Sequence, residues 1–269
     1  MDVKNAISIV RMSDVGKMRE RNEDAVASDL TTGLVMVADG MGGYKAGDVA
    51  SQMTALIVTS GIAELMYQQQ VSKDKSNALS VQDMLIKTVA SANEIIYKTS
   101  QEQSVCAGMG TTFVGGIFSD NKITVGHIGD SRLYRLREGK LEQLTEDHSL
   151  LQEQMNAGLI TKEQAKNSND GHLVTRALGT DPEVELEINE YETMVGDYYL
   201  LCSDGLTDLV EDHEIREEML SADGDMRLAA KNLVRLANNY GGTDNVSVII
   251  AFVKDAFAIK HGWIHQLLG

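Results

Sequence analysis

The stretch VADGMGGYKAGDVAS, Val37–Ser51, decides the fold prediction for this chain. An apolar run over 34–38 ends at the carboxylate of Asp39, and a helical pattern begins at about Ala46. Small residues predominate between the two, among them the glycines Gly40, Gly42, Gly43 and Gly47. Glycine lets a backbone approach other groups closely, because it carries no side chain. We therefore expect a buried strand, an acid at its end, and a loop that leaves room beside that acid.

Outside this stretch, the hydrophobic pattern predicts blocks of strands and blocks of helices. Apolar residues have helical spacing over about 46–69, 81–100 and 226–237, and 148–171 is polar and helical in pieces. Strand-like runs cover 6–10, 34–38, 110–118, 122–129, 132–137, 140–144, 197–203 and 246–253. Helices in consecutive blocks favour antiparallel sheets over a sheet in which single helices alternate with strands. The fold class that we predict is therefore an α+β layered sandwich.

The composition narrows the classes of partner. The chain has 269 residues, of which 43% are hydrophobic, so it can fill a substantial core. Its formal net charge of −16 repels nucleic acid and anionic membranes. No apolar run approaches the ~20 residues that span a bilayer, and the N-terminus lacks the pattern of a signal peptide. We expect no nucleic-acid partner, no membrane partner, and clustered carboxylates that suit hard cations.

The two cysteines do not form a recognisable catalytic site. Cys106 and Cys202 are too few for a disulfide framework or a zinc ribbon, and reduced core thiols in a cytosolic protein are the simpler interpretation. Cysteine-dependent phosphatases need an arginine six positions after the cysteine, where this chain has Thr112 and Asp208. The sequence also lacks the GxxxxGK[ST] loop of common nucleotide hydrolases.

Four aspartates lie at the ends of strand-like runs, each close to a glycine: Asp39, Asp130, Asp204 and Asp244. An aspartate beside a glycine is ordinary in turns, so each one alone has a turn interpretation. Four of them at strand ends, with few cations beside them, favour a shared site for Mg²⁺ or Mn²⁺. Two such ions would acidify a bridging water and stabilise a phosphoryl group under attack. Spacing alone does not show that the four carboxylates meet.

Eight segments together resemble the protein phosphatase 2C family, the metal-dependent serine/threonine phosphatases, in its compact bacterial form. They occur in the family's order and cover about residues 4–254. The segments are VGKMRERNEDA, VADGMGGYKAGDVAS, MGTTFVGGIF, VGHIGDSRLYRL, LTEDHSL, VTRALG, LLCSDGLTDLV and GGTDNVSVII. The resemblance implies a four-layer α-β-β-α sandwich, in which two central antiparallel sheets are flanked by helix pairs.

The resemblance also implies roles for particular residues. Asp39 matches the ligand that bridges two catalytic metals, and the carbonyl of Gly40 matches a ligand of the second. Asp204 and Asp244 match ligands of the first metal, and Asp130, with Asp204 shared, matches a third metal site of bacterial members. The remaining matches are Asp24 and Asn245, which hold metal-bound waters, and Arg19, which grips the substrate phosphate. On its own, Arg19 would be interpreted as an exposed surface cation and Asp24 as a solvated charge.

The sequence departs from the family pattern at two positions that concern proton transfer. Many eukaryotic relatives carry a histidine where this chain has Met41, and bacterial relatives often carry one where it has Tyr44. The general acid is therefore unassigned; a metal-bound water is our first hypothesis and Tyr44 a weaker second one.

We divide the chain into a phosphatase domain, 1–254, and a C-terminal tail, 255–269. Within the domain, about 146–182 matches the family's variable flap, which could help to choose substrates or be a plain surface insertion. The tail contains the single tryptophan, Trp263, and is interpreted as a docked terminal helix or a partner-binding segment.

The main functional hypothesis is a cytoplasmic protein phosphatase that uses two Mg²⁺ or Mn²⁺ ions, with a third ion expected. Water would attack the phosphorus of phosphoserine or phosphothreonine directly, without a covalent enzyme intermediate. Phosphoprotein substrates and a cognate serine/threonine kinase follow as expectations from the resemblance. We also expect a monomer, although no motif in the sequence indicates the oligomeric state. Two alternatives stay open: a non-catalytic regulatory module on the same fold, and a two-metal hydrolase that acts on small phosphoesters.

Overall fold

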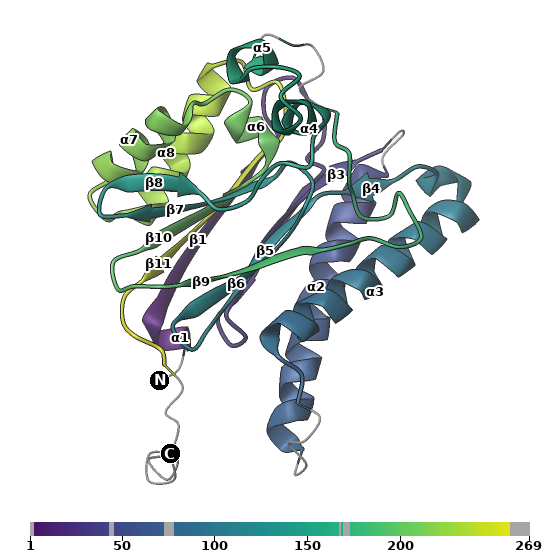
Figure 1. The fold of residues 1–269 in the computed structure, drawn as a ribbon, viewed down its shortest axis with the longest axis vertical. Helices are drawn as coiled ribbons and strands as arrows, with labels where there is room; N and C mark the ends of the chain where they lie inside the picture. The colour runs from purple at the N-terminus through teal and green to yellow at the C-terminus, as the bar shows by residue number, and fades with distance from the viewer. Residues whose placement is uncertain (1–2, 43–45, 73–77, 167, 169–172, 259–269) are drawn as a thin grey trace.

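The computed structural model describes residues 3–42, 46–72, 78–166, 168 and 173–258. In this part of the chain, two antiparallel sheets lie face to face, and a pair of long helices covers the outer face of each (Figure 1). The predicted α+β sandwich with four α-β-β-α layers is therefore confirmed.

One sheet joins strands from both ends of the chain. Its strand order is β1 (Ile7–Asp14), β11 (Val246–Val253), β10 (Tyr198–Cys202), β7 (Arg132–Arg137) and β8 (Lys140–Gln143). The hairpin predicted between β7 and β8 is present. Its turn residues Glu138 and Gly139 have φ of 50° and 75°, as a two-residue turn with both φ positive requires.

The other sheet contains the strand that ends beside Asp39. Its order is β2 (Asp24–Asp29), β3 (Leu34–Met41), β5 (Phe113–Ser119), β6 (Lys122–Ile128) and β9 (Glu187–Glu192), and β4 (Gly110–Thr111) pairs with the end of β3. The pattern analysis did not predict β2 or β9.

The long helices are α2 (Gly47–Val71) and α3 (Val81–Glu102) on the second sheet, and α7 (Asp212–Ser221) and α8 (Met226–Asn239) on the first. Ser80 begins α3 with a capping box, in which its hydroxyl accepts from the N–H of Asp83 and the Asp83 carboxylate accepts from the N–H of Ser80. The shorter helices are α1 (Val3–Ala6), the 3₁₀ turn η1 (Ser104–Cys106), α4 (Leu150–Asn156), α5 (Lys162–Lys166) and α6 (Asp204–Thr207).

Alternation along the central strands divides the core into layers. In β3, Leu34 and Met36 face α2 and α3, whereas Val35 and Val37 face the other sheet. Because both faces of the strand are covered, every residue over 34–38 is apolar and fully buried. Each large side chain buried in this way contributes roughly 1.5–3 kcal/mol.

The start of the predicted C-terminal tail belongs to this core. Phe257 is buried between the sheets, and its ring meets Phe118 edge to face at 6.3 Å. The N–H of Phe257 donates to the side chain of Asn121. Trp263 lies outside the described residues, so the interpretation of the tail as a docked helix stays a prediction.

Helix α2 is long and apolar enough, by length and composition, to cross a membrane. The sequence analysis did not identify such a run. Core helices of many proteins pass the same test, and α2 packs against β3 and α3 through Ala50, Val58 and Ile62.

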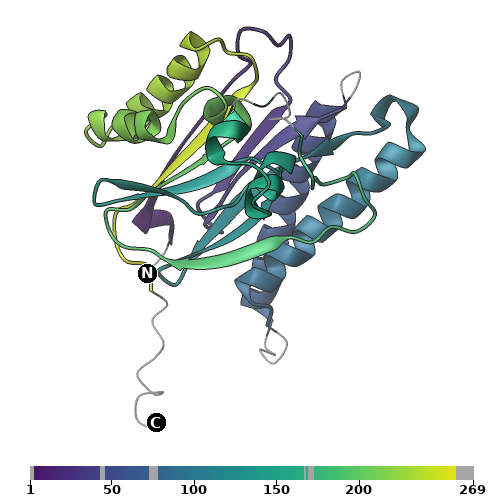
Figure 2. The same ribbon diagram turned by 45° about the horizontal axis from the view of Figure 1, so that its top comes forward.

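The predicted flap, 146–182, carries α4 and α5 (teal in Figures 1 and 2). Both helices lie at the end of the sandwich, next to α6. The two arms of this insertion pair with each other near its base. The N–H of Thr175 donates to the carbonyl of His148, and the N–H of Leu150 donates to the carbonyl of Leu173. The expectation of short helical pieces here is confirmed for the described residues.

Candidate metal centre

The antiparallel topology brings the predicted aspartates to one end of the sandwich. Asp39 is near the end of β3, and the pairing of β2 with β3 sets Asp24 directly opposite it. Asp204 directly follows Ser203 at the end of β10, and Asp244 lies two residues before β11. The end of β10 pairs with the start of β11, so both aspartates lie at the same end. Asp130 follows β6 and precedes β7, whose first residue pairs with the end of β10.

The carboxylates are close enough to raise one another's pKa. Burial raises the pKa of Asp39 well above its ordinary value, and the charges of Asp24, Asp204 and Asp130 raise it further. A hydrogen bond between the carboxyls of Asp39 and Asp204 adds to this effect. Two carboxyl groups can share such a bond only if one of them holds a proton.

Asp130 and Asp24 are affected in the same way. Burial raises the pKa of Asp130 well above its ordinary value, followed by the charge of Asp204. Burial raises the pKa of Asp24 to about 6, and the charges of Asp204 and Asp244 contribute. Hydrogen bonds from Ser203 and Ser247 to Asp24 oppose the rise, and Ser203 Oγ lies 2.8 Å from Asp24 Oδ2.

This group of residues fits divalent cations. Oδ1 of Asp24 is buried and has no hydrogen-bond partner, which is the state expected of an oxygen that serves an ion or its water. The atoms nearby that could bind a metal are carboxylate and backbone oxygens. Such ligands suit Mg²⁺ and Mn²⁺ rather than metals that prefer sulfur or nitrogen. A bound cation would replace the proton that the crowded carboxyls otherwise need.

Close backbone packing explains the glycines that follow Asp39. A Cβ on Gly40 would lie 2.1 Å from the carbonyl oxygen of Gly47 and 2.6 Å from that of Glu23. A Cβ on Gly47 would lie 2.7 Å from the carbonyl oxygen of Gly40 and 2.6 Å from Oε2 of Glu23. The Gly40 carbonyl, a predicted metal ligand, and a carboxylate oxygen of Glu23 thus both lie against the place that a Cβ of Gly47 would take.

Glu23 is therefore a residue of the centre that the sequence analysis did not identify. Burial raises its pKa, and the charges of Asp48 and Asp244 raise it further. Its carbonyl accepts from the N–H of Gly40 at 3.1 Å and from Ser51 Oγ at 2.5 Å. The feature of the sequence that could have indicated Glu23 is its position in RNED, next to Asp24.

Arg19 lies over the rim of the centre. Its Nη2 is 2.6 Å from Oδ2 of Asp244, and its side chain is 52% exposed. The N–H groups of Lys17 and Met18 both donate to the carbonyl of Gly242 and hold this loop against the Asp244 segment. The guanidinium is thus at the entrance, where it can meet an anion that arrives from solvent.

Asn245 is buried under the same loop, and three backbone groups contact its side chain. Its amide nitrogen donates to the carbonyls of Val15 and Arg21, at 2.9 and 2.8 Å. Its oxygen accepts from the N–H of Glu23 at 2.8 Å. Asn245 therefore fastens both ends of the Arg19 loop, and its predicted role in holding a metal-bound water stays a prediction.

The structure describes only one of the two positions considered for the general acid. Met41 is the last residue of β3 and has no titratable group. Tyr44 lies outside the described residues, so its role as a proton donor stays a prediction.

A cavity of about 500 Å³ extends from the centre beneath the flap helices. Asp130 and Asp204 lie on its wall, together with residues of α4, α5 and the segment around α6. Its other charged lining residues are Arg132, Asp147, Lys162, Asp208, Glu211 and Asp212. The space is large enough for part of a substrate beyond the phosphate group.

Comparison with known proteins agrees with this arrangement. A family model described as protein phosphatase 2C matches residues 17–238. The serine/threonine phosphatase stp of Listeria monocytogenes is 36% identical over 241 residues, which cover 88% of this chain and 92% of the relative. The serine/threonine protein phosphatase PstP of Mycobacterium tuberculosis is 39% identical over 246 residues, covering 90% of this chain and 44% of the longer PstP.

Solved structures share the whole sandwich. The serine/threonine phosphatase Stp1 of Staphylococcus aureus has a TM-score of 0.83 at 30% identity, covering 95% of this chain and 98% of its own. The catalytic domain of PstP in complex with two manganese ions has a TM-score of 0.79 at 36% identity, covering 93% and 99%. With the family model matching most of its length, this chain belongs to the protein phosphatase 2C family.

Proposed function

We propose that this chain is a metal-dependent protein serine/threonine phosphatase, which hydrolyses phosphoserine and phosphothreonine in protein substrates. The observation that carries the proposal is the convergence of Asp39, Asp204 and Asp244, with Asp24 and Asp130 beside them, at one end of the sandwich. The membership of the family and its named relatives support the same activity.

Most of these residues would bind metal ions or their waters, and Arg19 would bind the substrate phosphate. Asp39, the Gly40 carbonyl, Asp204 and Asp244 would hold two Mn²⁺ or Mg²⁺ ions. Asp130 would hold a third ion with Asp204, while Asp24 and Asn245 would hold waters. When bound, the two ions supply positive charge that acidifies water and stabilises the phosphoryl oxygens.

Arg19 would bind the phosphate of the substrate. Its guanidinium can present two parallel N–H groups to two phosphate oxygens, and it would leave Asp244 to do so. In the reaction, a water oxygen bonds to phosphorus, and the bond from phosphorus to the serine or threonine oxygen breaks. The products are inorganic phosphate and the free hydroxyl, which needs a proton from a donor not yet assigned.

The thiol groups do not support a cysteine nucleophile. Burial raises the pKa of Cys202 to about 12, so its thiol stays protonated at neutral pH. Cys106 is also buried. Both cysteines are free, which supports a reducing, cytoplasmic location as part of the proposal.

The remaining expectations concern partners and boundaries. A cognate serine/threonine kinase is proposed, because each dephosphorylated hydroxyl must have been phosphorylated first. A monomer is proposed, since each sheet has its apolar faces covered within one copy. The domain is proposed to cover 1–254 with the flap at about 146–182, and the tail to cover 255–269, with Phe257 of the tail packed into the core of the domain.

The decisive experiment measures phosphate release from a phosphothreonine peptide in Mn²⁺, with Asp39→Asn as the matched variant. Turnover by the wild type and its loss in the variant are expected. No turnover in either, together with no Mn²⁺ uptake in titration calorimetry, would favour the non-catalytic regulatory module. Faster hydrolysis of a nucleotide or sugar phosphate than of the peptide would favour a hydrolase of small phosphoesters.

A further inference from the structure

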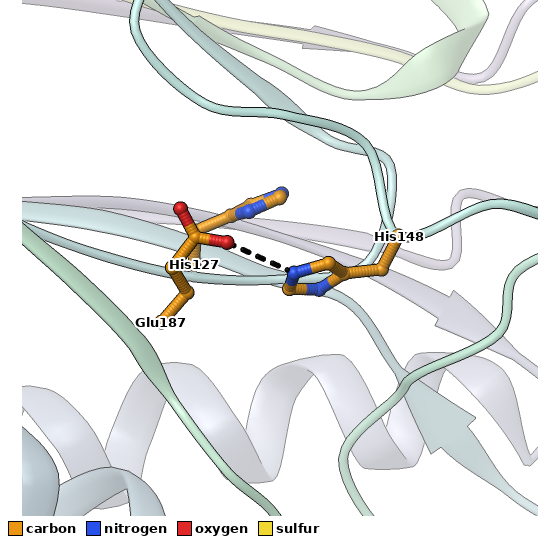
Figure 3. A group of neighbouring side chains, drawn as sticks. All are labelled: His127, His148 and Glu187. Atoms are coloured by element: carbon orange, nitrogen blue, oxygen red, sulfur yellow. Dashed lines mark hydrogen bonds and ion pairs between the residues drawn. The ribbon is translucent and has the colours of Figure 1, made fainter. Parts of the chain in front are cut away.

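A second polar cluster lies outside the group of aspartates. It consists of His127 at the end of β6, His148 at the base of the flap and Glu187 at the start of β9 (Figure 3). One ligand atom from each lies within 4.8 Å of the others. The two rings are 4.6 Å apart between centroids and inclined by 31°.

The hydrogen bonds of His148 define which nitrogen carries its proton. The N–H of Gly129 donates to Nδ1 of His148 at 3.1 Å, so in the neutral ring Nδ1 is the acceptor. The proton is then on Nε2, which lies 3.2 Å from Oε2 of Glu187 (Figure 3). His148 therefore accepts from the backbone on one side and donates to a carboxylate on the other.

This tautomer disfavours a metal ion in the cluster. A histidine that binds a metal through Nε2 carries its proton on Nδ1 and donates it to an acceptor. Here Nδ1 faces the N–H of Gly129, so two donors would point at each other. The pKa of His127 is lowered to about 4 by burial and then by His148, so its neutral ring could bind a metal, whereas His148 could not do so through Nε2 without losing its hydrogen bond from Gly129. We interpret the cluster as a support for the neighbouring backbone.

The backbone of His148 strengthens the same connection. Its N–H donates to the carbonyl of Gly129 at 2.8 Å, so the two residues are joined by two hydrogen bonds. Its carbonyl accepts from the N–H of Thr175 at 2.8 Å, on the returning arm of the flap. One buried residue thus connects both arms of the flap, β9 and the loop after β6.

That loop carries Asp130, which directly follows Gly129 in the chain. Gly129 has a φ of 107°, and a Cβ there would lie 2.7 Å from the side chain of Thr112. Thr112 in turn contacts the metal centre, since its Oγ1 accepts from the N–H of Asp39 at 2.9 Å. The loop is therefore confined by Thr112 on one side and by His148 on the other.

We propose that His148, oriented by Glu187, is a positioning residue that sets the backbone of Gly129 and thereby the place of the Asp130 carboxylate in the metal centre. The inference rests on the proposed function, because it needs Asp130 to hold an ion. It assigns the histidine no contact with substrate.

The test is a titration of Mn²⁺ into the full chain, followed by calorimetry. In His148→Ala the affinity of the Mn²⁺ site that Asp130→Asn removes should fall by about 10-fold, as for other partners that orient metal ligands. His148→Asn should restore most of the affinity, because its side-chain oxygen can accept from Gly129. Lys122→Ala, which removes an exposed ion pair with Glu190 on the neighbouring strands, is the control and should bind as the wild type does.

Two further variants distinguish a loss of positioning by His148 from a general loss of structure. Adding His148→Ala to Asp130→Asn should weaken Mn²⁺ binding no further, because the two changes act on one site. Glu187→Gln removes the charge that orients the ring but little volume, and it should cause a smaller loss in the same direction. If His148→Ala does not fold, Glu187→Gln decides alone: it must weaken only the site that Asp130→Asn removes, and unchanged binding would overturn the inference.

Several outcomes would overturn the inference. If the wild type binds Mn²⁺ and His148→Ala binds it equally well, His148 does not position Asp130, while the proposed function stands. If the wild type binds no Mn²⁺, the proposed function and this inference fail together. Titration with Co²⁺ tests the alternative, since an absorption band of tetrahedral cobalt that disappears in His127→Ala would make the cluster a metal site.

Discussion

Asp24 and Asp39 occupy paired positions on adjacent antiparallel strands, at the end of the sandwich where the other aspartates lie. Like charges directly opposite each other destabilise a sheet. Burial and the neighbouring carboxylates raise the pKa of both groups. The protein therefore keeps a pair that weakens the metal-free fold, which is the arrangement expected where a cation completes it.

The first prediction concerns the pH dependence of stability without metal. The pKa of Asp24 is about 6 in the folded chain against an ordinary value of 3.8, so its contribution to stability is complete below about pH 4 and is lost as pH rises through 6. The difference corresponds to on the order of 3 kcal/mol. In EDTA, the melting temperature should fall as pH rises from 4 to 7.

Mn²⁺ should remove most of this fall, because the ion replaces the proton between the carboxylates. Asp24→Asn is the matched variant and should flatten the metal-free profile. Circular dichroism melts at several pH values measure both effects. A metal-free melting temperature that rises over this interval would contradict the repulsion between the carboxylates.

The second prediction is that Asp39→Asn separates stability from activity. Turnover of a phosphopeptide should fall by at least about 100-fold, since even partners that only orient metal ligands contribute 10- to 100-fold. The metal-free melting temperature should instead rise by about 2–4 °C for each kcal/mol of repulsion removed. Loss of activity together with a lower metal-free melting temperature would mean that Asp39 has a structural role instead.

Much of this centre could be predicted from the sequence, because its aspartates directly follow or precede strong strand patterns. Asp39 follows a run of five apolar residues, and Asp204 follows the run in β10. The family resemblance then supplied roles that no spacing could supply. Convergence itself depends on strand pairing between distant segments, such as β10 with β11, which periodicity within a segment does not reveal.

Elements with a weak apolar pattern were not predicted. Strand β9 reads EINEYE, and charged residues of this kind are usual on a sheet edge, where they oppose pairing with other chains. Helix α7 buries only Ile215 and Met219, too narrow a stripe for a periodic signal. The sequence feature that could have predicted the start of α7 is the pair Glu211 and Glu214, which forms a capping box. For Asn245 the resemblance supplied a role in holding a metal-bound water, whereas its backbone contacts, more than 200 positions away in the chain, could not be predicted from spacing.

The third prediction concerns Arg19 as the phosphate holder. Charge-assisted hydrogen bonds contribute about 1.5–3 kcal/mol, so Arg19→Ala should lower kcat/KM for a phosphopeptide by about 10- to 100-fold. Arg19→Lys should recover only part of this, because an ammonium group cannot form two parallel bonds. The melting temperature should hardly change, since the pair with Asp244 is exposed and such pairs contribute little. Unchanged kcat/KM in Arg19→Ala would exclude the assigned role.

The fourth prediction tests the close packing behind the glycines. Gly40→Ala places a Cβ 2.1 Å from the Gly47 carbonyl oxygen, and two backbones must separate to admit it. We expect a loss of several kcal/mol in unfolding free energy, at the upper end for single substitutions, and weaker Mn²⁺ binding. Gly158→Ala is the control: its φ is 69° but nothing lies within 4 Å, so it should lose only about 1–2 kcal/mol. Gly40 is not among the glycines with a positive φ, so a loss no larger than that of Gly158→Ala would show that the close contact costs little.

The fifth prediction follows from the three backbone contacts of Asn245. Asn245→Ala removes the side-chain partner of two part-buried carbonyls and one N–H, so we expect the melting temperature to fall, with at most about 1–3 kcal/mol lost for each group left unpaired. Because the freed segment carries Arg19, we also expect KM for a phosphopeptide to rise. Asn245→Asp keeps the acceptor for the Glu23 N–H but turns a carboxylate oxygen toward two carbonyl oxygens, so its melting temperature in Mn²⁺ should be no higher than that of Asn245→Ala. If Asn245→Ala lowered Mn²⁺ affinity but left the melting temperature and KM unchanged, Asn245 would hold a metal-bound water rather than the Arg19 loop.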